Sequence, residues 1–109
     1  MNNQQLIEIL NNCTATCNYC AASCLEEEDV KMMVGCIRLD MDCAEICQTT
    51  ANLLARGSEH GLHLLQECAE ICGKCASECE KHAPKMDHCK SCAEACRKCE
   101  EACKKGVNN

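Results

Sequence analysis

Sixteen of the 109 residues are cysteines, and their spacing is that of a helix face. They occur in four stretches, at steps of three and four residues. At about 100° per residue, such steps keep the side chains of a helix within an arc of roughly 80°. Each stretch therefore carries one stripe of sulfur, which Asp40 interrupts in the second. The positions are Cys13, Cys17, Cys20 and Cys24; Cys36, Cys43 and Cys47; Cys68, Cys72, Cys75 and Cys79; and Cys89, Cys92, Cys96, Cys99 and Cys103.

Seven pairs of these cysteines stand four residues apart, which places their Cβ atoms about 5 to 6 Å apart on a helix. A disulfide requires Cβ atoms about 3.5 to 4.5 Å apart, so oxidation within one helix would strain it. A metal with bonds near the 2.3 Å of zinc thiolate bridges sulfurs up to about 4 to 5 Å apart. The pattern therefore predicts metal ligands. The pairs are Cys13/Cys17, Cys20/Cys24, Cys43/Cys47, Cys68/Cys72, Cys75/Cys79, Cys92/Cys96 and Cys99/Cys103, with Cys36 and Cys89 outside them.

Charge balance and ligand softness favour Cu(I) as the bound ion. One monovalent ion per thiolate makes a buried core neutral, whereas Zn²⁺ with four thiolates keeps a charge of −2, and uncompensated buried charge is costly. Soft sulfur ligands also select Cu(I). The C-x-x-C strings resemble zinc knuckles, but knuckles lie on turns and these lie inside helical runs. Iron–sulfur ligation uses a few cysteines in loops. A zinc or mixed-metal thiolate buffer remains an alternative.

Four helices must position the stripes. Weak helix signals around residues 25–29, 56–61 and 82–85 separate stretches rich in Ala, Leu, Glu and Lys. The sequence predicts helices at roughly 3–25, 29–56, 59–82 and 86–105, in a single domain covering 1–109. Short connections predict an all-α, antiparallel four-helix bundle, and heptad-like stripes face the axis of such a bundle.

Composition excludes several classes of protein. The net charge of −6 and the near absence of aromatic side chains argue against nucleic acid as a partner. No stretch approaches a membrane span, and the N-terminal residues lack the features of a signal peptide, so we expect a reducing, cytoplasmic location. There is no nucleophile–base set and no glycine-rich phosphate loop, so we expect no enzyme activity. Because so many cysteines also occur in secreted scaffolds, a disulfide-stapled helical interaction module is a second alternative.

Antiparallel packing makes the two ends of the bundle different. One end gathers Leu6, Ile9, Leu10, Leu54, Leu64 and Leu65, which predict an apolar plug. The other end brings Met32, Met33, His82 and His88 beside the outer cysteines. Thioether and imidazole groups also bind Cu(I), so these four are candidate metal ligands and this end is the expected copper entrance. His60 and His63 are expected to face solvent.

The helical C-x-x-x-C pairs, with the run 28–33 before Cys36 and the run 37–40 after it, resemble the cytosolic copper storage proteins over essentially the whole chain. The resemblance implies a four-helix bundle that binds many Cu(I) ions on core thiolates, usually as a homotetramer, in the bacterial cytosol. It also assigns the seven pairs to the metal sites. The function indicated is copper storage, detoxification or both, and copper donor or acceptor proteins are the expected partners.

Overall fold

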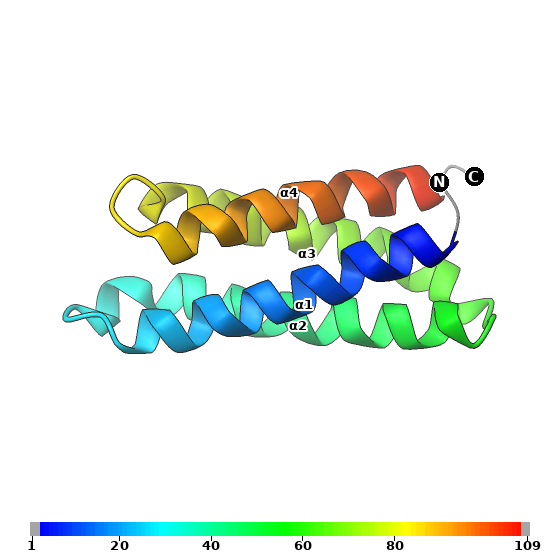
Figure 1. Ribbon diagram of the computed structural model, residues 1–109, viewed down its shortest axis with the longest axis horizontal. Coiled ribbons are helices and arrows are strands. Elements are labelled where there is room, and N and C mark those ends of the chain that lie inside the picture. Colours follow the sequence, from blue (N-terminus) through cyan, green and yellow to red (C-terminus); the bar gives the residue numbers. More distant parts are fainter. Residues whose placement is uncertain (1–2, 108–109) are drawn as a thin grey trace.

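The computed structural model describes residues 3–107. Four helices make up the bundle: α1 (Asn3–Leu25), α2 (Val34–Ala55), α3 (His60–His82) and α4 (Asp87–Val107), with a short 3-10 helix, η1 (Val30–Met33), before α2. Consecutive helices run in opposite directions (Figure 1). The predicted antiparallel four-helix bundle with a cysteine-lined core is thereby confirmed. Residues 1–2 and 108–109 of the expected domain 1–109 lie outside the described residues.

The bundle is narrow because its interior side chains are small. It measures 43 × 19 × 18 Å along its principal axes. Apart from cysteine, the most frequent buried residue is alanine, at one or two positions in each helix. Small side chains let helix axes approach closely, and this brings opposite stripes into contact. The buried alanines are Ala21, Ala44, Ala51, Ala69, Ala76, Ala93 and Ala102.

The start of the second helical stretch differs from the single helix expected over 29–56. Its first turn is the 3-10 helix η1, and the α-helix begins at Val34. The Asp29 side chain accepts a hydrogen bond from the Met32 amide at 3.3 Å, and the Asp29 carbonyl accepts from the same amide. These i to i+3 bonds favour the tighter winding. The later helices lie within two residues of the ranges given above.

The two ends of the bundle have different connections (Figure 1). We call the end where α1 passes into η1 and α3 turns into α4 the mouth, and the other end the closed end. At the closed end Gly57 adopts φ 73°, the left-handed conformation that ends many helices, and starts the turn from α2 to α3. A Cβ at Gly61 would lie 2.9 Å from the Leu54 side chain, so glycine permits the tight packing there.

Leucines fill the closed end. Leu6, Leu10, Leu54 and Leu65 are buried, whereas Ile9 and Leu64 are only half-buried. Apolar burial of this kind contributes about 1.5 to 3 kcal/mol per side chain. This plug stabilises the bundle without metal and leaves the mouth as the polar end of the sulfur column.

Candidate metal centre

All sixteen cysteines lie in one core cluster, and each side chain has 0% of its surface exposed. Every one of them is a free thiol in this structure. The stripes therefore meet along the bundle axis, as the helical phase predicted. Thiols on the surface or paired as disulfides would have contradicted a metal-binding core, and neither arrangement is present among the cysteines.

The sulfur atoms form a nearly continuous column. Within helices, six of the seven pairs have Sγ atoms 3.9 to 4.0 Å apart, as in Cys13/Cys17 and Cys99/Cys103. Contacts between helices are as short or shorter: Cys36 Sγ lies 3.4 Å from Cys79 Sγ, and Cys17 Sγ lies 3.5 Å from Cys96 Sγ. One ion bridges sulfurs at such separations. Metal binding is therefore as feasible across helices as along them.

The column divides into overlapping groups of four donors whose ligand atoms all lie within 4.8 Å of one another. Each of the four all-cysteine groups named below draws sulfurs from at least three helices, and several cysteines belong to two groups. Shared sulfurs suit bridging ligands rather than isolated sites. The groups include Cys13/Cys47/Cys72/Cys99, Cys13/Cys17/Cys43/Cys96, Cys17/Cys75/Cys92/Cys96, Cys20/Cys24/Cys36/Cys89 and Cys20/Asp40/Cys79/Cys92.

Asp40 fills the gap in the stripe of α2 and is fully buried. Its Oδ1 accepts hydrogen bonds from the thiols of Cys92 at 3.1 Å and Cys75 at 3.2 Å. Cys36 and Cys79 approach the same carboxyl group at 3.7 Å. Burial, followed by the Coulombic effects of Cys92 and Cys75, raises the pKa of Asp40 to about 11. The metal-free core therefore holds Asp40 as a neutral acid at neutral pH.

We expect Asp40→Asn to stabilise the metal-free protein at neutral pH. The unfolded chain ionises this carboxyl near its usual pKa of about 3.9, whereas the folded chain keeps the proton until about pH 11. Wild-type stability therefore falls as the pH rises from about 4, and the amide removes that loss. Circular-dichroism melts should show a gain of at least about 5 °C near pH 7.5, since 1 kcal/mol shifts the melting temperature of such a domain by about 4 to 8 °C.

The pH dependence of the stability gain in Asp40→Asn shows whether the gain comes from the lost ionisation of the carboxyl group or from changed packing. The gain should shrink to near zero around pH 3, about one unit below the unfolded pKa of about 3.9, where the unfolded carboxyl is largely protonated. Asp42→Asn, on the exposed side of α2, serves as the control and should change little at either pH. An equal gain for Asp40→Asn at both pH values would contradict the ionisation argument.

Burial and mutual contact control the protonation of the thiols. Near the mouth, burial raises the pKa of Cys89 to about 12 and raises that of Cys24, with the Coulombic effect of Cys36 adding to both. Deeper in the column, the hydrogen bond between Cys13 and Cys17 raises the pKa of Cys17 and lowers that of Cys13. The Cys24 and Cys89 thiols therefore hold their protons at neutral pH, whereas hydrogen bonds from Cys20 and Cys79 lower the pKa of Cys36 to about 3. A metal that binds Cys24 and Cys89 displaces their protons, so binding weakens as pH falls.

His88 lies against the outermost sulfurs. Its Nδ1 is 3.5 Å from Cys20 Sγ, 3.5 Å from Cys89 Sγ and 3.9 Å from Cys24 Sγ. These three cysteines belong to one group of four with Cys36. The structure thus places this candidate ligand within reach of the sulfur column at the mouth.

The other candidate ligands at the mouth lie differently. His82 Nε2 lies 3.4 Å from Glu78 Oε2, without the alignment of a hydrogen bond. Met33 is fully buried in the core cluster, whereas 53% of the Met32 surface is exposed. Among the described residues, neither His82 nor Met32 has a recorded polar contact with a sulfur of the column. His88 is the candidate whose ligand atom, Nδ1, lies 3.5 to 3.9 Å from thiols of the column.

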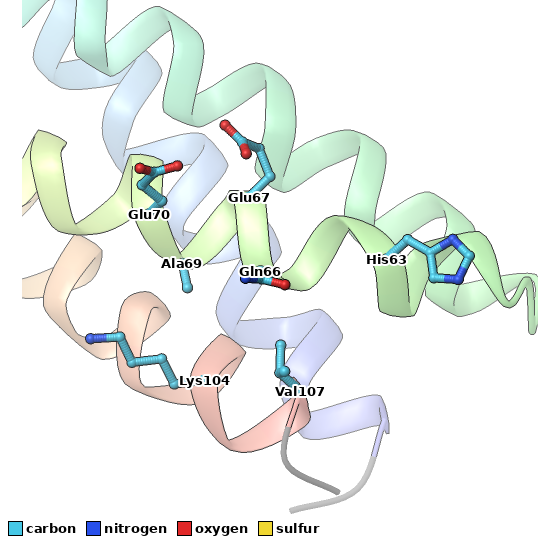
Figure 2. Close-up of a pocket in the computed structure, with 7 residues that line it drawn as sticks. All are labelled: His63, Gln66, Glu67, Ala69, Glu70, Lys104 and Val107. Carbon is cyan, nitrogen blue, oxygen red and sulfur yellow. The ribbon is translucent and has the colours of Figure 1, made fainter.

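The remaining histidines face solvent. His60 and His63 are exposed, and their rings pack edge to face with centroids 5.6 Å apart. Figure 2 shows His63 beside a groove between α3 and the end of α4, which Gln66, Glu67, Glu70, Lys104 and Val107 also line. The groove contains no sulfur and is separate from the column.

One contact at the mouth does not follow from the spacing of the cysteines. Glu27 Oε2 lies 2.9 Å from His88 Nε2, although the acidic run 26–29 resembles an ordinary solvated turn. The signal was present, because position 27 follows Cys24 by three residues and so continues the stripe of α1 beyond the end of the helix at Leu25.

The fold and the core define a helical bundle with a metal-binding interior and a storage rather than a catalytic role. The sequence matches the family described as "Copper storage protein" over residues 1–108. The chain belongs to the copper storage protein family. Among the described residues, no helix combines the length and apolar character that crossing a membrane requires.

Bacillus subtilis and Streptomyces lividans both have proteins similar to the chain. An uncharacterized cysteine-rich protein of Bacillus subtilis, YhjQ, is 39% identical over 84 residues, which cover 77% of this chain and 76% of that protein. The copper storage protein Ccsp of Streptomyces lividans, loaded with 10 copper equivalents, is 41% identical and superposes with a TM-score of 0.93, covering 97% of this chain and 83% of the other. A cytosolic copper storage protein of Streptomyces lividans with five coppers is 40% identical and superposes with a TM-score of 0.94. The match covers 98% of this chain and 92% of the other.

Proposed function

We propose that this chain binds and stores several Cu(I) ions at once on the thiolates of its sixteen core cysteines, for copper storage, detoxification or both. The observation that carries this proposal is the charge of the interior. Among residues 3–107 the buried polar or charged side chains are Thr14, Asp40 and Thr50, so the interior supplies no cation. Monovalent ions, one per thiolate, neutralise such a core, whereas zinc tetrathiolates leave it negative.

We further propose that His88 is a ligand at the mouth and that copper enters there. Its Nδ1 adjoins three of the outermost thiols, and imidazole is neutral when it binds, so it adds no charge to the core. His82, Met32 and Met33 are proposed only as groups near the entrance. The half-buried Met86 packs against the core cluster at the same end.

The proposed location is the bacterial cytosol, where thiols remain reduced, and the similarity to a protein described as cytosolic supports it. The proposed assembly is a homotetramer. Exposed apolar side chains on α1 and α2, Tyr19 and Met41, would contribute to contacts between copies. Copper donor or acceptor proteins are the proposed partners.

Anaerobic titration of the fully reduced protein with Cu(I), read by native mass spectrometry, tests these proposals together. We expect several ions per chain, bound as tetramers, with prior zinc displaced by sub-stoichiometric Cu(I). Thiol counting before the titration should find sixteen reactive groups in the chain. Retention of zinc against Cu(I) would favour the zinc-buffer alternative, and a low thiol count would favour the disulfide-stapled one.

A further inference from the structure

One hydrogen bond connects the segment between α1 and η1 to α4 across the mouth. Glu27 Oε2 lies 2.9 Å from His88 Nε2, and the side chains of Glu27 and His88 are 34% and 12% exposed. We propose that Glu27 is a positioning residue: it fixes the His88 ring so that Nδ1 faces the outermost thiols and is ready to take up Cu(I). This inference rests on the proposed copper-binding function and deepens it.

The chemistry of the pair determines which nitrogen carries the proton. An ionised carboxylate only accepts hydrogen bonds, so His88 Nε2 must donate to Glu27. In the neutral ring, Nδ1 then carries the lone pair. That lone pair faces the sulfur atoms of Cys20, Cys24 and Cys89, at 3.5 to 3.9 Å. Without the carboxylate, the neutral ring is free to place its proton on Nδ1, which would block this donor.

Glu27 is also the only member of its acidic run that is placed for this role. Glu26 and Glu28 are exposed, and within the described residues neither makes a polar contact with His88. Carboxylates that hold metal-binding histidines through the second ring nitrogen orient the ring and strengthen the ligand, and their loss typically costs 10 to 100-fold in metal affinity or activity. A merely attractive negative charge would be shared by the whole run.

The run therefore provides a matched control for the experiment. Glu27→Gln and Glu28→Gln remove the same charge from nearly the same place, but only the first changes the group that contacts His88. The glutamine amide can donate as well as accept, so it no longer obliges His88 Nε2 to be the donor. Glu27→Asp keeps the charge and shortens the side chain by one methylene group. For each reduced full-length variant, stopped-flow mixing with a Cu(I)–chelator complex measures the uptake rate. Nitrogen-15 NMR of the histidine rings in the metal-free protein reports which nitrogen of His88 is protonated.

We expect uptake to be about 10-fold slower in Glu27→Gln and Glu27→Asp, with some His88 protonated at Nδ1, while Glu28→Gln behaves as wild type. Final copper content should be nearly unchanged in all variants. Equal slowing in Glu27→Gln and Glu28→Gln, or slowing without a change at His88, would overturn the positioning role while leaving storage intact. A wild-type protein that takes up no Cu(I) would overturn the proposed function itself.

Discussion

Loading the reduced protein with Cu(I) is expected to raise its unfolding temperature by at least about 20 °C. A ligand bound only by the folded state stabilises it by about 2.7 kcal/mol per site when its free concentration is 100 times the dissociation constant. Several ions share the column of sixteen buried thiols, so their contributions accumulate. In a domain of this size, 1 kcal/mol corresponds to about 4 to 8 °C. Thermal melts followed by circular dichroism, under anaerobic conditions, measure the shift.

The size of this shift in melting temperature reports how much more strongly Cu(I) binds the folded protein than the unfolded chain. Thiols of the unfolded chain also bind Cu(I), so the gain will be smaller than the sum over the sites. Removing the metal with a strong cuprous chelator should restore the melting temperature of the metal-free protein. A loaded protein that melts at the metal-free temperature would show that copper binds outside the folded core.

Replacing Cys13, Cys17, Cys43 and Cys96 together by alanine should lower the copper capacity by about four ions per chain. These four form one group in the interior, with Cys13 Sγ lying 3.9 Å from Cys17 Sγ, 3.8 Å from Cys43 Sγ and 3.9 Å from Cys96 Sγ. If one monovalent ion balances each thiolate, losing four thiolates removes the charge that four ions neutralise. Native mass spectrometry after anaerobic titration gives the count.

Thr50 provides the matched control for this variant. It is fully buried three residues after Cys47, and its hydroxyl donates to the Ile46 carbonyl at 2.7 Å. Thr50→Ala therefore removes a buried polar group from the same stripe but no sulfur, and the capacity should stay at the wild-type value. The helical circular-dichroism signal shows whether each variant folds. If the quadruple variant does not fold, the double variant Cys13→Ala/Cys17→Ala replaces it, and its expected loss is about two ions per chain. Full capacity in folded thiol variants would contradict binding along the column.

The helical phase of the cysteines was sufficient to predict most of the core. Steps of three and four residues oblige Cys13, Cys17, Cys20 and Cys24 to share one face whatever surrounds the helix, because the geometry of an α-helix is local. Such a face, repeated in four helices with short connections, is buried only if the stripes meet. The bundle, its cysteine-lined axis and the apolar closed end all follow from this rule.

The contacts between helices could not be predicted in the same way. Asp40 was recognised as a gap in the stripe of α2, but its thiol donors come from α3 and α4 as well as from α2. Which sulfurs meet at 3.4 to 3.9 Å across helices depends on how far each helix is shifted along the axis. Spacing along one helix does not fix that shift, because many registers bury the same stripe.

The residues at the mouth show most clearly what the sequence determines and what depends on the tertiary structure. The sequence by itself placed His82, His88, Met32 and Met33 near the outer cysteines, because chain direction and helix length determine which residues share an end. Only the tertiary structure separated them: His88 turns toward the sulfurs, His82 toward Glu78, Met33 inward and Met32 outward. The physical reason is that the directions of side chains at helix ends depend on where each helix starts and stops and on the path of the connections. Here the segment after α1 brings Glu27 to the far side of the His88 ring.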